Sequence, residues 1–184
     1  CMMIGKSSMD ELAMGGTNKS ALTGPVSNPY DVTRISGGSS GGSAALVASG
    51  LIPFALGSDT GDSIRKPAGY CGVVGFKPTW GRISRYGVIP YASSLDHVGA
   101  FTRSVEDMAI VIEALAGRDD RDMTSSYKEV EPYYTNLTDQ VQDKKDTDEN
   151  WLQEIALKEA IKKLNGRERL VLDLRFYKGR TQIE

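Results

Sequence analysis

Two turns rich in glycine and serine carry the residue types in this chain that could do covalent chemistry. The first runs from Gly37 to Ser43 and the second from Asp59 to Arg65. Glycine lets the backbone approach another group closely, and consecutive amides in a tight turn form a concavity that binds anions. A serine in such a concavity is a candidate nucleophile if a base can accept its proton. The alternative is that these residues form a flexible linker.

The segment between the two turns has the pattern of a folded scaffold. Residues 44–49 are small and compatible with a helix, which Gly50 can end in a left-handed conformation. Residues 51–56 form an apolar run bounded by glycines, and such a run is typical of a buried strand. This punctuation favours a structured site over a flexible linker.

The rest of the first two-thirds alternates short apolar runs with capped segments. We expect a short helix at residues 9–14, a strand at 72–76 and a loop with solvated arginines, Arg82 and Arg85, at 81–88. Ser104 begins a capping box, and helical apolar spacing follows to residue 116. The alternation predicts an α/β fold, with strands near 51–57 and 72–76 in one sheet and the 104–116 helix packed on it.

Three motifs resemble those of the amidase signature family: GGSSGGSAA, DTGDSIRKPA and CGVVGFKPTWGRISRYG. The resemblance covers about residues 2–126 and includes GKSSMDELAMGG and ASSLDHVGAFTRSVEDMA. These longer strings are similar to the glutamine-hydrolysing subunits of tRNA-dependent amidotransferases. The resemblance implies an α/β core with a mixed sheet covered by helices.

The resemblance also implies a role for each residue of the two turns. Family members use a triad of a lysine, a serine in a cis peptide and a nucleophilic serine. Matching the motifs puts Ser39 in the cis-serine position and Ser63 in the nucleophile position, with Arg65 as structural support that could pair with Asp59. The backbone amides that would form the oxyanion hole are those of Thr60, Gly61, Asp62 and Ser63.

Two departures from the family pattern lead us to expect an inactive chain. The catalytic lysine of the family lies far upstream of the first turn, and neither Lys6 nor Lys19 lies in the triad-lysine motif. Asp62 also stands where the family has a glycine. A carboxylate there opposes a developing oxyanion, and a Cβ is costly if the position needs a positive φ.

The parent complex implied by the resemblance converts Glu-tRNA(Gln) to Gln-tRNA(Gln) with ammonia from glutamine. Its expected partners are the other amidotransferase subunits, glutamine as substrate and mischarged tRNA bound through the complex. ATP and Mg are used by that complex, and we expect no cofactor or metal to be bound by this fragment. The class of activity that the resemblance implies is a cytoplasmic amidase, or glutaminase, within a carbon–nitrogen ligase.

Composition is compatible with this class and excludes few others. The formal charge is −2 with 40% hydrophobic residues, and no run approaches the ~18 apolar residues of a membrane span. We expect Cys71 to be a buried reduced thiol, because its neighbours are apolar. His97 is the only histidine, and we expect a structural or surface role for it.

The last third changes character. Charges and tyrosines dominate residues 118–150, so we expect a linker at 127–150 after a core fragment at 1–126. Residues 151–184 resemble the opening of region 4 of a sporulation-type sigma factor, with helices expected at 151–164 and 167–177. The recognition helix is not part of the matching string, so we do not expect DNA binding. The alternative to an amidase is therefore a non-enzymatic truncated or fused fragment with a sigma-like transcription module.

Overall fold

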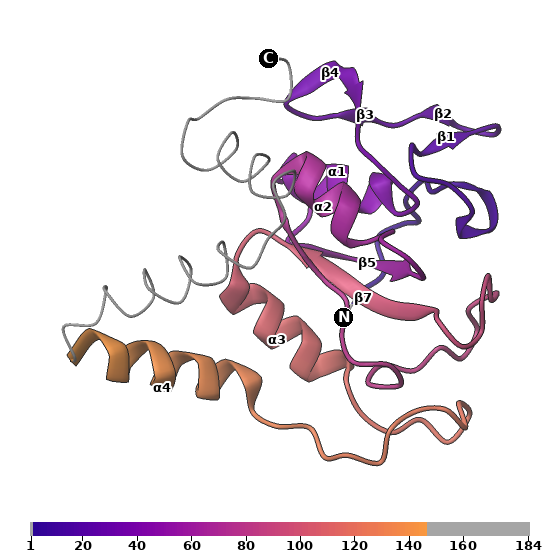
Figure 1. Cartoon of the computed structure of the whole chain (residues 1–184). Coiled ribbons are helices and arrows are strands. Elements are labelled where there is room, and N and C mark those ends of the chain that lie inside the picture. Colours follow the sequence, from indigo (N-terminus) through magenta and orange to yellow (C-terminus); the bar gives the residue numbers. More distant parts are fainter. Residues whose placement is uncertain (1, 147–184) are drawn as a thin grey trace, which may run out of the picture. The chain divides into compact units, whose positions relative to one another are not determined.

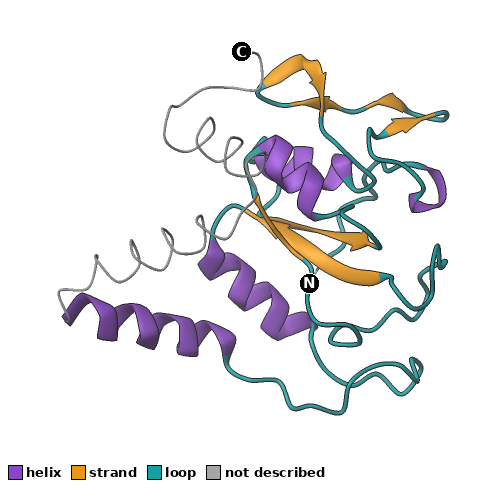
Figure 2. Ribbon diagram, in the orientation of Figure 1, coloured by secondary structure: helices purple, strands orange, loops and turns teal. Residues whose placement is uncertain are grey.

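The computed structural model describes residues 2–146, and Figures 1 and 2 show its helices and strands. The chain divides between Leu137 and Thr138 into two compact units, which we describe separately. The elements are η1 (Glu11–Ala13), β1 (Lys19–Ser20), β2 (Gly24–Pro25), β3 (Ser27–Asn28), β4 (Asp31–Ile35), α1 (Gly41–Ala48), β5 (Phe54–Asp59), α2 (Arg65–Cys71), β6 (Val74–Phe76), β7 (His97–Thr102), α3 (Val105–Leu115) and α4 (Tyr133–Asp146).

A three-stranded sheet in the order β5-β7-β6 forms the centre of the first unit. The two strands expected from the sequence therefore lie in one sheet, as predicted. Their neighbour β7 runs antiparallel to both, with Asp59 opposite His97 and Phe76 opposite Ala100. Every described strand pair is antiparallel, and β5 and β6 run parallel to each other without being neighbours.

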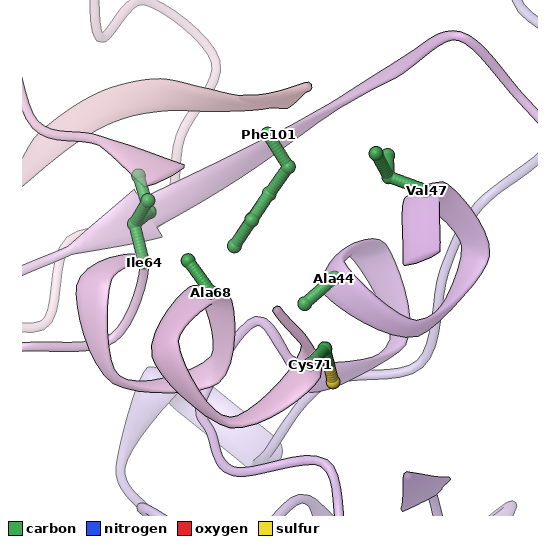
Figure 3. Close-up of a cluster of buried hydrophobic side chains, with 6 residues drawn as sticks. All are labelled: Ala44, Val47, Ile64, Ala68, Cys71 and Phe101. Carbon is green, nitrogen blue, oxygen red and sulfur yellow. The ribbon is translucent and has the colours of Figure 1, made fainter. Parts of the chain in front are cut away.

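Helices cover both faces of this sheet (Figure 1). Successive residues of a strand point to opposite faces. Phe101 packs against Val47 and Ala68 on the side of α1 and α2, as the close-up in Figure 3 shows, whereas Ala100 packs with Met108 on the side of α3. Because β7 is buried on both faces, it is the central strand of an α/β/α sandwich, and the predicted α/β class is confirmed.

Two helix ends follow the sequence prediction. The Ser104 side chain accepts a hydrogen bond from the Asp107 amide at 3.0 Å and caps α3. Gly50 has φ +75° directly after the C-cap of α1. Both features come from local chemistry, since a hydroxyl satisfies a free helical amide and glycine adopts a left-handed conformation without a Cβ clash.

Several elements differ from the prediction. The segment 9–14 forms only a 3₁₀ turn, because Leu12 and Ala13 have positive φ values of 54° and 58°. The strand predicted at 51–56 begins later, at Phe54, because its bounds are set by pairing with β7. Helix α2 and strand β7 were not predicted, since neither has an amphipathic period of its own.

The segment before the sheet folds into two small hairpins. β1 pairs with β2 and β3 with β4, both antiparallel, in the turn-rich region 19–35. Asn28 attaches the second hairpin to the core by donating from Nδ2 to the carbonyl of Tyr70 at 2.7 Å. This segment therefore lies close to the end of α2.

Helix α4 begins inside the segment 127–150, for which the sequence predicted a linker. Its start is held by Arg82, which is buried rather than solvated as we expected. Arg82 donates to the carbonyls of Lys128 and Glu129 at 2.5 and 2.6 Å and to the Tyr133 hydroxyl at 2.8 Å. A long-range anchor of this kind leaves no periodic signal in the sequence.

Residues 147–184 lie outside the described part of the chain, and with them the helices predicted at 151–164 and 167–177 and the sigma-like segment. Among residues 2–146, no helix combines the length and apolarity needed to cross a membrane.

Candidate active site

The fold brings the two glycine-serine turns into direct contact. The first turn leads into α1, and the second joins the end of β5 to the start of α2. The Ser40 amide donates to the carbonyl of Ser63 at 3.1 Å. The Ser40 hydroxyl bonds both the amide and the carbonyl of Ser58 at 3.2 Å. Ser40, the residue after Ser39, is therefore bonded to Ser63 within the second turn and to Ser58 directly before it.

Ser39 is fully buried, and its hydroxyl oxygen has no hydrogen-bond partner within residues 2–146. The peptide bond between Gly38 and Ser39 is cis, as the family resemblance implied. A buried hydroxyl without a partner costs about 1–3 kcal/mol. A further polar group placed next to the Ser39 hydroxyl would therefore supply the hydrogen bond that it lacks.

The N-terminal segment supports the first turn from the other side. The Asp10 amide donates to the carbonyl of Ser39 at 3.0 Å, and the Asp10 carboxylate accepts from the amides of Asn18 and Lys19. A Cβ on Gly38 would lie 2.9 Å from the backbone nitrogen of Asn18 and would also clash with an Asp10 carboxylate oxygen. Glycine at 38 is therefore required by this close approach.

Ser63 is 6% exposed and lies at the end of the second turn, immediately before Ile64 and α2. Its carbonyl is held by Ser40, and no hydrogen bond of its hydroxyl is observed among the described residues. The side chain of Ile64 is fully buried in the core of Phe101 and Ala68 (Figure 3). The core thus fixes the backbone that carries the candidate nucleophile.

Side-chain donors hold two carbonyls of the second turn. Lys77 Nζ donates to the carbonyl of Thr60 at 3.1 Å. The Arg65 guanidinium donates to the carbonyl of Gly61. In a trans peptide the C=O and the N–H of one unit point in opposite directions. These two contacts therefore direct the amides of Gly61 and Asp62 away from Lys77 and Arg65.

The next two carbonyls are held by backbone amides. The backbone amide of Lys66 donates to the carbonyl of Asp62 at 2.8 Å, and the backbone amide of Ser40 donates to the carbonyl of Ser63. Among the described residues, we observe no hydrogen bond from the amides of Gly61, Asp62 or Ser63. Three successive amides are therefore left available to a ligand, which is one requirement of an oxyanion hole.

Asp59 is the fully buried anchor of the turn. Its carboxylate accepts from the Ile64 amide at 2.9 Å and the Arg65 guanidinium at 3.2 Å, and pairs with Lys77 Nζ at 2.9 Å. Burial alone would raise the pKa of this carboxyl, but hydrogen bonds from Arg65, Ile64 and Lys77 outweigh it and hold the pKa below its ordinary value. The expected pairing of Arg65 with Asp59 is present.

Asp62 does not have the strained backbone that we considered from the sequence. It is absent from the residues with positive φ, so a Cβ is tolerated there. Its side chain is 50% exposed and pairs with Lys66 Nζ at 2.7 Å. The hydrogen bond to Asp62 is the main cause that raises the pKa of Lys66. The ammonium offsets part of the negative charge next to the free amides.

Two residues of this site were missed by the sequence reasoning. Lys77 follows β6, and Asp96 precedes β7. Asp96 is 6% exposed and accepts from the Thr60 hydroxyl at 2.5 Å and from the Tyr91 and Ala92 amides at 2.9–3.1 Å. Both residues lie in motifs that we quoted for the resemblance, but only the pairing of β5, β6 and β7 brings them to Thr60.

His97 occupies a structural position, as expected. It begins β7, and its Nδ1 lies 2.6 Å from the carbonyl oxygen of Leu95. No contact between His97 and either Ser39 or Ser63 is observed. Within residues 2–146 there is also no group of three His, Cys, Asp or Glu side chains arranged to hold a metal.

A pocket of about 350 Å³ adjoins the site through Asp96 and lies between the loops 85–96 and 121–124. Its charged walls are already paired. Asp122 accepts from the Arg85 amide at 2.8 Å, and Arg121 pairs with Asp119 at 3.0 Å. The Arg85 side chain stacks over Trp80 and bonds Thr124 at 2.8 Å, so it is not the solvated cation that we expected.

Comparison with known proteins gives one family model, Amidase, which matches residues 1–147. Among curated relatives, the A subunit of glutamyl-tRNA(Gln) amidotransferase from Chlorobium phaeobacteroides is 57% identical over 132 residues, 72% of this chain and 28% of the relative. The same protein from Staphylococcus aureus is 58% identical over 125 residues, 68% of this chain and 26% of the relative. The chain thus spans between a quarter and a third of the length of these relatives.

Solved structures give the same result. The crystal structure of the glutamyl-tRNA(Gln) amidotransferase A subunit from Thermotoga maritima has a TM-score of 0.68 at 50% identity and covers 70% of this chain and 28% of that one. The native peptide amidase from Stenotrophomonas maltophilia has a TM-score of 0.67 at 42% identity, covering 72% of this chain and 29% of that one.

Proposed function

The chain belongs to the amidase family, and from this premise we propose that it forms part of a glutamine-hydrolysing subunit of a tRNA-dependent amidotransferase. The subunit would release ammonia from glutamine, and the complex would use it, with ATP and Mg, to convert Glu-tRNA(Gln) to Gln-tRNA(Gln). The partners in this proposal are the other subunits and, through them, mischarged tRNA. We also propose a cytoplasmic location, because the amidotransferase complex in this proposal acts on tRNA in the cytoplasm.

The proposed chemistry starts at Ser63. Its oxygen attacks the side-chain amide carbon of glutamine, and its proton passes to Ser39, whose own proton passes to a neutral lysine. The tetrahedral oxyanion is stabilised by the amides of Thr60, Gly61, Asp62 and Ser63. Collapse breaks the C–N bond, and the same proton relay runs backwards to release ammonia. Water then hydrolyses the acyl-enzyme to glutamate.

The single observation that supports this proposal best is the unpartnered hydroxyl of Ser39. A relay serine needs an acceptor for its proton, and the completely buried hydroxyl of Ser39 bonds no described residue, Ser63 included. The relay would therefore need both a base and a rotation that brings the Ser39 and Ser63 hydroxyls into contact. A lysine from a segment outside this chain would satisfy this hydroxyl and supply the base. Lys66 and Lys77 are bound to Asp62 and Asp59 instead.

The experiment compares this chain with a longer form of the protein that includes the family lysine. We expect glutamate release from glutamine by the longer form and none by this chain. Ser63→Ala should abolish the activity, whereas Ser49→Ala, which changes an exposed serine at the end of α1, should leave it intact. A longer form that hydrolyses only peptide amides would keep the amidase assignment and overturn the glutamine proposal.

A further inference from the structure

We propose that Lys77 is a positioning residue for amide hydrolysis: it fixes the Thr60–Gly61 peptide so that the Gly61 amide faces the reacting oxygen. The inference rests on the proposed function, and it concerns a residue whose role neither the turn motifs nor the serine pair assign. Its basis is the pair of contacts made by one ammonium, to the carbonyl of Thr60 at 3.1 Å and to the carboxylate of Asp59 at 2.9 Å.

The topology explains why a lysine serves at this position. β5 and β6 both run opposite to β7, so they finish, at Asp59 and Phe76, toward the same end of the sheet. Two strands separated by a third are about 10 Å apart. The long side chain of Lys77, which follows β6, therefore crosses toward the turn after β5, and this side chain is 18% exposed.

The two contacts have different consequences. The pair with Asp59 balances a buried carboxylate that Arg65 also binds, so Asp59 keeps one cation if Lys77 is lost. The bond to Thr60 has no such substitute among the described residues. The Thr60 hydroxyl is held separately by Asp96, and this contact fixes the side chain rather than the peptide plane.

Lys77 is unsuited to act as the base itself. A base must offer a lone pair, and the Lys77 ammonium donates to two acceptors, one of them an anion. No contact of Lys77 with Ser39 or Ser63 is observed. Its influence on the reaction therefore passes through the backbone of Thr60 and Gly61.

A kinetic test uses the longest form of the protein that hydrolyses glutamine. Since losing an oxyanion-hole donor altogether costs about 10²–10³ in rate, we expect Lys77→Met to lower kcat by about 10–10²-fold. KM should change little, and Lys77→Arg should recover most of the loss. The charge-matched control is Lys128→Met, which removes an exposed ammonium paired with Glu131. Unchanged kcat in Lys77→Met, or equal losses in the Met and Arg variants, would overturn the proposal.

A second test needs no activity and uses this chain as it is. The amide nitrogen of Gly61 and the carbonyl of Thr60 belong to one peptide unit. The NMR resonance of the Gly61 amide therefore reports on the hydrogen bond between Lys77 and the Thr60 carbonyl. Lys77→Met should move this resonance while the signals of the core residue Phe101 stay in place, and Lys128→Met should move neither. An unmoved Gly61 resonance sinks the positioning role. If the longer wild-type form has no glutaminase activity, only the proposed function is contradicted, because the NMR result on this chain still stands.

Discussion

The Ser40 amide donates to the carbonyl of Ser63 at 3.1 Å, and this bond joins two turns separated in the sequence by a helix and a strand. It ties the backbone next to Ser39 to that of Ser63. The bond therefore couples the backbones that carry the two serines, whereas the Ser39 hydroxyl itself bonds no described residue.

Two buried serines of the first turn should respond in opposite ways to truncation. Ser39→Ala removes a hydroxyl without a partner and should raise the free energy of unfolding by up to about 1 kcal/mol. Ser43→Ala removes the donor to the carbonyl of Leu56, a bond of 2.7 Å, and should cost about 1–2 kcal/mol. Urea unfolding of both variants of this chain checks the pair. A destabilised Ser39→Ala would contradict the assignment of Ser39 as an unsatisfied group.

Asp59 should make folding stability depend on acid. Its pKa is lowered in the folded state, so its contribution is complete above the ordinary carboxyl range and is lost as the pH falls through the folded pKa. Asp59→Asn leaves the cations Arg65 and Lys77 without their buried partner and should cost about 3 kcal/mol or more at pH 7.

The measurement is the urea midpoint between pH 7 and pH 3. The difference between wild type and Asp59→Asn should shrink as the pH falls, because Asp59 of the unfolded wild-type chain binds a proton at a higher pH than Asp59 of the folded chain. A difference that stays constant over this range would show that the charge of Asp59 contributes nothing. The pair Asp120–Arg118 provides a control, because the Asp120 side chain is 95% exposed, and Asp120→Asn should change stability little at any pH.

Cys71 should be inert toward thiol reagents in the folded protein. It is fully buried as predicted, and burial raises the pKa of its thiol to about 11. Reaction requires the thiolate, so at pH 8 alkylation of Cys71 should await unfolding. Mass spectrometry of the peptide that contains Cys71, with and without urea, makes the test. Rapid labelling in the native state would show that this face of α2 opens.

The parts of the fold that could be predicted are those fixed by local chemistry. The cap at Ser104, the left-handed Gly50 and the apolar runs before Asp59 and after Gly72 all carry short-range signals. β7 carries none, since the sequence 97–102 combines a histidine, a glycine and a threonine with apolar residues. Its identity as a strand comes from its two partners, and only the folded chain supplies those.

The residues of the candidate site also fall into those that local sequence predicts and those that depend on distant contacts. The turns and their serines are recognisable from residue type, and the structure brings the two turns together. The roles of Ser39 and Ser63 in a reaction stay predictions. Lys77, Asp96 and the buried Arg82 could not be found from local spacing, because each acts on a segment distant in the sequence. Long polar side chains in loops give no periodic signal for their partners.

Asp62 and Lys66 should alter the proposed reaction in opposite directions. In the longer, active form, Asp62→Gly removes a carboxylate next to the developing oxyanion and should raise kcat. Lys66→Met leaves that carboxylate without its ammonium, at present 2.7 Å away, and should lower kcat. Both side chains are partly exposed, so each change should be modest, about tenfold or less, and should weaken as salt is added.

The double variant separates electrostatics from backbone effects. If Lys66 acts only by offsetting Asp62, its removal should have no further effect once Asp62 is glycine, so a double-mutant cycle should show strong coupling. Glutamine hydrolysis at low and at high ionic strength provides the readout. Additive effects of the two substitutions, or a loss with Lys66→Met that salt does not reduce, would show that Lys66 acts through its place in α2 and not through its charge.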